Sequence, residues 1–390
     1  MENKTIPKLR FNGFSGEWIN KKLNDIADIT LGHSPKGENY TDDPNDYILV
    51  QGNADMKNGW VKPRVWTKQI TKLASPGDII LSVRAPVGEV GKTGFEVVIG
   101  RGVASIKGNE FVYQNLKKMK VDDYWRLYSS GSTFESINSS DLKNAFISIP
   151  NKDEQQKIGE FFKQFDDRIA LQQRQIELLK ESKQGFLQKM FPKDGERVPE
   201  VRFDGFSGTW EESKAESIFT SVSDKNHTDL PILSASQKKG MVYRDDNGID
   251  IKYDVKSTNN YKRVVPGQFV IHLRSFQGGF AYSNIEGITS PAYTIIDFRN
   301  KQTQSYYFWK NVLTSNNFIK RLETVTYGIR DGKSISFSDF STLKFKFPSI
   351  EEQQKIGEFF KQLDDNIALH EKELELLKET KKGFLQKMFV

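Results

Sequence analysis

Three arginines occupy positions at which a folded scaffold presents side chains to a ligand. Arg84 and Arg274 each follow an apolar run and precede a turn, and Arg101 lies between two glycines. Such glycines would let the backbone approach a ligand closely. The guanidinium group is a planar fork that binds guanine O6 and N7 together, or a phosphate. We therefore expect these three arginines to contact DNA.

Other polar side chains in predicted loops are candidate DNA contacts of the same kind. Lysines there would follow phosphates and so add affinity for every sequence alike. For any single residue, the alternative is an ordinary surface or structural role. The candidates are Lys36, Ser132, Thr133, Ser236, Gln237, Lys238, Lys239, Gln277, Tyr327, Arg330 and Lys333.

Signatures of catalysis are missing from the sequence. There is no G-x-x-x-x-G-K-[ST] loop, no Asn/Asp-Pro-Pro-aromatic motif of the kind that adenine methyltransferases use, and no cysteine. The four histidines lack the spacing of metal ligands. Two carboxylate pairs, at 166–167 and 364–365, fall on predicted long helices, where solvated or salt-bridged faces explain them. We expect binding rather than catalysis, with no catalytic residue and no metal.

The elements that position these groups follow from an internal repeat. Residues 154–191 return at 352–389 with 29 of 38 positions identical. Each copy lacks proline and carries apolar residues at alternating four–three spacing, which is typical of a coiled-coil seam. We predict two helices of about 55 Å that pair with each other. An antiparallel pair is favoured, because a parallel pair would need a long return connection. Gln172 would then meet His370 as a polar layer that fixes the register.

Both helices are predicted to begin at the same signal. Asn151 and Ser349 stand three residues before Glu154 and Glu352, which is the spacing of a capping box. Before each globular region a second repeat occurs, PKLRFNGFSGEW at 7–18 and PEVRFDGFSGTW at 199–210, and it predicts a tight turn. Antiparallel helices would bring the C-terminus beside the N-terminus, so the chain would form a cyclic two-fold object.

The two regions between the repeats differ from each other in sequence, and both indicate an α+β plan. Strands are predicted at 78–83, 96–99, 103–106, 269–273 and 293–298, and helices at 115–128 and 305–322. We divide the chain into a first globular region (1–150), a first long helix with linker (151–198), a second globular region (199–348) and a second long helix (349–390).

Composition sets wider limits. The net charge of +6 over 390 residues, with a sequence pI near 9.0, leans mildly toward polyanionic partners. There is neither a signal peptide nor an apolar run of membrane-spanning length. We expect a soluble, cytoplasmic protein.

The chain resembles the specificity subunit of a type I restriction–modification system. The resemblance covers the whole chain. It rests on the duplicated EQQKIGEFF and GFLQKMF helices, on PxxRFxGFSGxW, and on GDIILSVRAPVGEVG followed by IGRGVASI. The second region has LRSFQGG where the first has SVRAP, so the resemblance does not by itself assign the role of Arg84 to Arg274.

The resemblance implies two target recognition domains that each read one half of a bipartite double-stranded DNA site. A pseudo-two-fold antiparallel coiled coil would separate them. It also implies two modification (methyltransferase) subunits, which bind S-adenosylmethionine, and restriction (translocase and nuclease) subunits, while this chain binds no cofactor and no membrane. Two alternatives remain: a coiled-coil scaffold whose globular regions bind protein or glycan, and an enzyme with an unrecognised site. A steep loss of DNA affinity with rising salt would argue against the scaffold.

Overall fold

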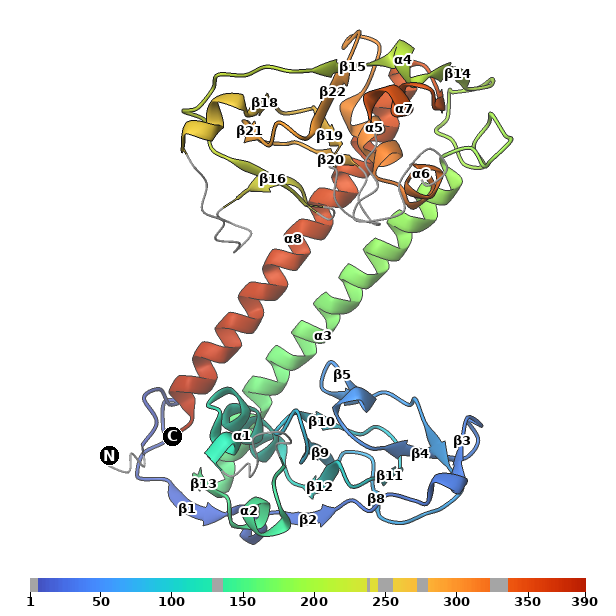
Figure 1. Cartoon of the computed structure of the whole chain (residues 1–390). Coiled ribbons are helices and arrows are strands. Elements are labelled where there is room, and N and C mark those ends of the chain that lie inside the picture. Colours follow the sequence, from blue (N-terminus) through green and yellow to red (C-terminus); the bar gives the residue numbers. More distant parts are fainter. Residues whose placement is uncertain (1–5, 128–135, 237–238, 245–254, 272–279, 323–335) are drawn as a thin grey trace. The chain divides into compact units, whose positions relative to one another are not determined.

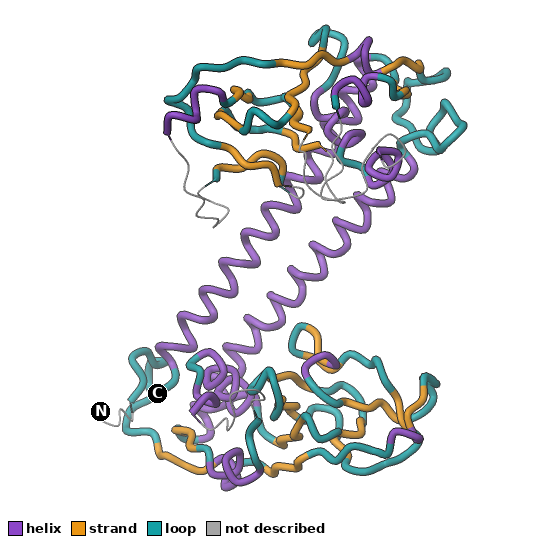
Figure 2. Tube along the Cα trace, in the orientation of Figure 1, coloured by secondary structure: helices purple, strands orange, loops and turns teal. Residues whose placement is uncertain are grey.

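A computed structural model describes residues 6–127, 136–236, 239–244, 255–271, 280–322 and 336–390 (Figure 1). The chain forms two compact units, Met1–Gln175 with His370–Val390, and Ile176–Leu369. Each unit holds a globular region of mixed helix and sheet and a segment of each of two long helices, α3 (Lys152–Lys189) and α8 (Ile350–Met388). Both helices are continuous (Figure 2). No helix in the described ranges is long and apolar enough to cross a membrane. The predicted α+β class is confirmed.

The described part of the first unit's globular region has two large sheets and a two-stranded one, β1-β13. One large sheet has the strand order β2-β12-β9-β10-β6-β5, and the other β3-β7-β4-β11-β8. Strand β9 is buried along its whole length between β12 and β10, as its apolar run predicts. The elements are β1 (Ile19–Lys22), β2 (Asp28–Leu31), β3 (Tyr40–Thr41), β4 (Tyr47–Val50), β5 (Met56–Lys57), β6 (Trp60–Val61), β7 (Trp66–Thr67), β8 (Leu73–Ala74), β9 (Ile79–Ser82), β10 (Val90–Lys92), β11 (Val97–Ile99), β12 (Val103–Lys107), α1 (Glu110–Val121), α2 (Ser139–Asn144) and β13 (Phe146–Ile149).

The second unit has a four-stranded sheet, β15-β22-β19-β20, over an aromatic core. The predicted helix at 305–322 is two helices here, because Ser315 starts a new one by accepting a bond from the Phe318 amide (3.1 Å). The elements are β14 (Glu211–Lys214), α4 (Ala215–Ile218), β15 (Phe219–Val222), β16 (Leu233–Ser236), β17 (Gly240–Tyr243), β18 (Lys262–Val264), β19 (Phe269–Ile271), β20 (Phe280–Tyr282), β21 (Gly287–Thr289), β22 (Thr294–Phe298), α5 (Tyr306–Leu313), α6 (Asn316–Leu322), α7 (Phe337–Ser341) and β23 (Lys344–Phe347).

Each globular region packs one of its helices closely against the backbone of a long helix. A Cβ on Gly159 would lie 2.9 Å from the Glu110 Cβ and 3.1 Å from the Phe111 nitrogen of α1. In the second unit a Cβ on Gly357 would lie 2.8 Å from the Phe308 nitrogen of α5. Only glycine allows so close an approach, which explains why both copies of the EQQKIGEFF motif carry it.

An aromatic cluster fills the contact between each globular region and its long helix, and we call this cluster the aromatic joint. In the first unit, its last member comes from the C-terminal end of the chain. Trp18 packs edge-on against Phe111 (5.6 Å between ring centroids), and Phe111 stacks on Phe389 (5.1 Å). The Leu9 amide donates to the Lys387 carbonyl (2.9 Å), which confirms that the two ends of the chain meet. The second unit repeats these contacts. Trp210 packs edge-on against Phe308, Phe308 stacks on Phe191, and the Val201 amide donates to the Lys189 carbonyl.

In the first long helix, the predicted capping box is only half present. Asn151 Oδ1 accepts from the Glu154 amide (2.9 Å), as predicted for the N-cap. The Glu154 carboxylate does not return a bond to the cap, because Arg10 takes both of its oxygens (2.6 and 2.7 Å). Arg202 holds Glu352 in the same way (2.7 and 2.6 Å). The turn motif is therefore fixed to the start of each helix by a buried bidentate ion pair.

The helices pair antiparallel within each unit. In the first unit, Gln172 Nε2 lies 2.8 Å from His370 Nδ1 and 2.8 Å from Glu373 Oε2. The predicted meeting of Gln172 and His370 is confirmed. In the second unit, Phe186 of α3 packs edge-on against Phe359 of α8 (5.0 Å). The pairing direction matches the prediction in both units.

Carboxylates on the helices are held by lysines. Asp166 pairs with Lys381 of α8 (2.6 Å) and Lys117 of α1 (3.1 Å), and the second unit matches this with Asp364, Lys183 and Lys310. Burial, with Lys117 close by, lowers the pKa of Lys381 to about 8. Burial opposes ionisation of Asp166, but the two lysines hold the pKa of this carboxyl below its ordinary value. These carboxylates are salt-bridged, which supports the structural explanation.

Candidate nucleic-acid interface

Arg84 and Arg101 lie at the same end of the β9–β12 pair. The strands are antiparallel with Ser82 opposite Val103, and one step further the Val83 amide donates to the Gly102 carbonyl (2.9 Å). Arg84 lies just after the end of β9, Arg101 lies just before the start of β12, and both are exposed. The strand register thus brings together two arginines that are 17 positions apart in the sequence.

The loop that carries Lys36 joins this end of the sheet. The Arg101 amide donates to Ser34 Oγ (3.1 Å), and the His33 amide donates to the Ile99 carbonyl (2.9 Å). Lys36 itself is exposed, and its amide donates to Gln69 Oε1 (2.9 Å). We call the exposed cations Lys36, Arg84 and Arg101 the basic end of the first region.

The glycines beside Arg101 have a different role from the predicted one. A Cβ on Gly102 would lie 1.9 Å from the Gln51 carbonyl oxygen, and a Cβ on Gly100 would lie 3.3 Å from Ser34 Oγ. The chain itself fills the space that was predicted for a ligand. The glycines allow three loops to pack together, so the Arg101 side chain, rather than its backbone, is the exposed group.

Nine candidates lie outside the described residues, and Ser132 and Thr133 are two of them. Arg84 forms a β-bridge with Ser136, the first described residue after the segment that holds those two. The remaining candidates outside the described residues are Gln237, Lys238, Arg274, Gln277, Tyr327, Arg330 and Lys333.

In the second unit, two candidates remain on the β16–β17 hairpin. The Lys239 amide donates to Ser236 Oγ (3.3 Å), and the Lys239 side chain is exposed. Gly240 has φ +74°, and a Cβ there would lie 2.3 Å from the Tyr282 carbonyl oxygen. The hairpin is therefore pressed against β20, which begins just after the segment that carries Arg274 and Gln277.

The sequence reasoning passed over Arg64, which the fold brings close to the basic end. Arg64 is bound to Asp55, and Asp55 also holds the amide of Gln51, the residue packed against Gly102. A signal was present: residues 56–77 contain five basic residues, two tryptophans and no acidic residue. Basic and aromatic residues together are typical of nucleic-acid binding surfaces.

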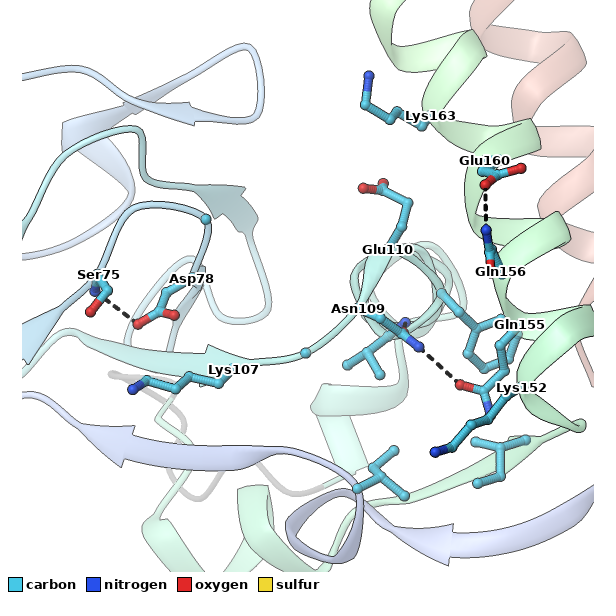
Figure 3. A pocket seen from close by; sticks show the side chains of 16 residues that line it. Ser75, Asp78, Lys107, Asn109, Glu110, Lys152, Gln155, Gln156, Glu160 and Lys163 are labelled. Carbon is cyan, nitrogen blue, oxygen red and sulfur yellow. Dashed lines mark hydrogen bonds between the residues drawn. The ribbon is translucent and has the colours of Figure 1, made fainter.

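A pocket of about 1000 Å³ lies at the opposite end of β12, beside α1 and α3 (Figure 3). Its polar groups serve the fold: Asp78 accepts from the Ser75 amide and the Ser105 hydroxyl (both 2.9 Å). Asn109 caps α1 and donates to Gln155 (3.0 Å). These two groups are committed to bonds that hold the fold together.

Metal chemistry has no candidate site among the placed side chains. Within the described ranges, no three His, Cys, Asp or Glu side chains are grouped so that they could hold a metal ion. Two of the four histidines have other partners: His370 lies in the helix pair, and His227 lies beside Asp224 (2.8 Å), where it contributes to lowering the pKa of that carboxyl.

Known proteins resemble this chain in sequence and in fold. The sequence model of the family described as type I restriction modification DNA specificity domain matches residues 15–181 and again residues 209–379. Two relatives from Methanocaldococcus jannaschii, the MjaX and MjaIX specificity subunits of type I restriction enzymes, are 29% and 30% identical over 196 and 181 residues. The aligned parts cover 47% and 42% of this chain, and only 44% and 41% of those relatives.

A solved structure gives the same result for the fold. The crystal structure of the S subunit of the type I restriction–modification system of M. genitalium aligns over 99% of both chains with a TM-score of 0.68, at 18% identity. The two family matches together span most of the chain and coincide with its two repeats. The chain belongs to the type I restriction–modification DNA specificity family, and it carries two copies of the family's domain.

Proposed function

We propose that this chain is the sequence-specific DNA-binding subunit of a type I restriction–modification complex. Each globular region would read one half of a bipartite site in double-stranded DNA, and the two long helices would set the gap between the halves. The observation that carries the proposal is the basic end of the first region. There, Lys36, Arg84 and Arg101 are exposed on loops that meet at one end of a buried sheet.

The duplicated frame supports two reading heads of different specificity. Both units repeat the buried Arg–Glu pair and the aromatic joint, while the sheets built on that frame differ in strand order. A constant frame with variable contents suits a protein that holds two unlike recognition surfaces in equivalent places. The role is one of targeting, without catalysis by this chain.

The partners follow from the family. Modification subunits, two of them if the two units dock alike, would bind S-adenosylmethionine and methylate adenine, and restriction subunits would translocate and cut DNA. The chain itself would hold no cofactor. Methylation by the purified chain, supplied with cofactor but without partners, would contradict this division of labour.

Arginine variants test the DNA contact. Arg84→Ala and Arg101→Ala are each expected to cost about 1–3 kcal/mol on the target sequence and to relax preference at one base pair, whereas Lys36→Ala should weaken all sequences alike. Fluorescence anisotropy on duplexes over a salt series measures this. Wild-type affinity should fall steeply with salt.

Lys22→Ala is a matched control that removes the same charge. Lys22 is exposed on β1, and the chain then enters β2 at Asp28, opposite Lys107 and so at the far end of β12 from Arg101. Its loss should leave the affinity unchanged. Binding that ignores both salt and the two arginines would rule out DNA as the ligand of this surface and favour a protein or glycan scaffold.

The length of the helices provides a second test. Removing one heptad from α3 and the facing heptad from α8 shortens the pair by about 10 Å, or about three base pairs. We expect the variant, assembled with modification subunits, to methylate the same two half-sites with a shorter gap. Sequencing of methylated DNA detects the change. An unaltered gap would mean that the helices do not act as the spacer.

A further inference from the structure

Arg64 is an exposed arginine held in place by a buried carboxylate. It lies between β6 and β7, and its side chain is 57% exposed while that of Asp55 is only 2% exposed. Both Nε and Nη2 of Arg64 lie 2.9 Å from Asp55 Oδ1. The guanidinium is therefore fixed along one edge by a charge-assisted contact.

The bound edge leaves the end of the fork available. Nε and one hydrogen of Nη2 face Asp55, so Nη1 and the second hydrogen of Nη2 point away from it. That end presents two parallel N–H donors, which is the geometry that matches O6 and N7 of guanine in the major groove. An arginine already fixed in this way loses little further side-chain entropy when it binds.

The carboxylate also ties Arg64 to the basic end. Asp55 Oδ2 accepts from the amides of Gln51 (2.7 Å) and Gly52 (3.2 Å). Gln51 in turn packs against the glycine that follows Arg101, since a Cβ on Gly102 would collide with its carbonyl oxygen. Two arginines are thus presented by loops that share one packed junction.

The surrounding charges suit a polyanion. The acid-free stretch 56–77 places Lys57, Lys62, Lys68 and Lys72 on the surface of the same region. Long flexible lysines are enough for phosphates, which need only charge. A rigid arginine adds most where the partner has a fixed planar pattern, as a base edge does. This contrast favours a base over a phosphate as the ligand of Arg64.

We propose that Arg64 reads a guanine in the target half-site of the first region, with Asp55 as the residue that positions it. This assignment rests on the proposed function. It adds a specificity-determining residue that lies outside the arginines flagged by the sequence.

Selection from a randomised duplex library tests the assignment with the full chain. Wild type should enrich one bipartite sequence. Arg64→Ala should enrich the same sequence except at one base pair of one half-site, where discrimination for guanine falls by about 5- to 150-fold. Asp55→Asn, which retains the size of the side chain, should loosen the same base pair. Melting curves establish which variants are folded, and Arg64→Ala alone decides the matter if Asp55→Asn unfolds.

Lys62→Ala is the matched control, because it removes an exposed cation only two residues away. It should lower the affinity for all sequences and leave the enriched sequence intact. If Arg64→Ala behaves like Lys62→Ala, Arg64 contacts a phosphate and the assignment is wrong; an unchanged profile also overturns it. If wild type enriches no sequence at all, the proposed function fails and this assignment fails with it.

Discussion

Arg10→Met is expected to lower the free energy of unfolding of the first unit by about 3–5 kcal/mol. The reason is the partner that the variant leaves behind. The Glu154 side chain is 0% exposed and gives both of its oxygens to Arg10. Without the arginine, a buried carboxylate must stay charged without a counter-ion or take up a proton. Removing one partner of such a pair costs far more than the pair contributes as a whole.

Arg10 also donates to the carbonyls of Ser15 and Gly16 (3.0 and 2.6 Å), so the variant loses the bonds that close the turn motif. Urea denaturation followed by circular dichroism measures the loss. Arg202→Met gives an internal repeat of the experiment, because Glu352 is 1% exposed and is bound in the same way.

The control is an ion pair of the same helix that faces solvent. Lys163 and Asp167 are both more than half exposed, so Lys163→Met should cost little. The change in charge is the same, but Lys163 lacks both the buried partner and the bonds to the turn motif that Arg10 makes. Losses of equal size for Arg10→Met and Lys163→Met would show that burial of Glu154 does not set the energy.

Repetition explains why so much of the frame was predictable from the sequence. Each of the two matching apolar seams needs a partner, and the other copy in the same chain provides one. The sequence distance between the two copies favours an antiparallel pair. The meeting of Gln172 with His370 then follows from counting residues, since both fall near the middle of their helices. Strand β9 was equally predictable from the sequence, because its apolar run lies between turn residues.

The sequence alone could not supply the long-range pairs. Glu154 satisfies the spacing of a capping box, yet Arg10, 144 positions away, binds it instead. Local spacing cannot reveal such a competitor. The same holds for the site: Arg84 and Arg101 were singled out separately, but only the β9–β12 register shows that they share one end of a sheet.

Arg64 shows the other limit. It follows no buried strand and precedes no glycine turn, so the rule that selected Arg84 passed over it. What distinguishes Arg64 is Asp55, a carboxylate that looks ordinary in the sequence and becomes buried only when the loop after β4 folds back. Recognising it requires burial, which three-dimensional packing determines. The basic stretch around it was visible in composition alone.

Asp166→Asn is expected to destabilise the first unit by about 2–4 kcal/mol at neutral pH, because it leaves Lys381 and Lys117 together without a counter-charge. Lys381 is the critical group, since its side chain is only 8% exposed. Asp364→Asn should cost less, because its lysines, Lys183 and Lys310, are 24% and 30% exposed.

The pH dependence of this cost follows from the pKa of Lys381. In the folded protein that pKa is lowered to about 8, below the ordinary value of 10.5, so the unfolded chain binds the extra proton between these values. Stability therefore rises with pH across that window through this group. Asp166→Asn removes the anion that supports the ammonium, so the pKa of Lys381 must fall further and the rise in stability must begin at lower pH.

The difference in free energy of unfolding between wild type and Asp166→Asn should accordingly narrow as the pH approaches 8, because Lys381 of the variant has already released its proton. Urea denaturation of both proteins at a series of pH values measures it. Lys381→Met in the Asp166→Asn background should restore much of the stability at neutral pH, since no buried ammonium remains. A difference that stays constant with pH, or a double variant no better than Asp166→Asn, would mean that the buried lysine is not what makes Asp166 necessary.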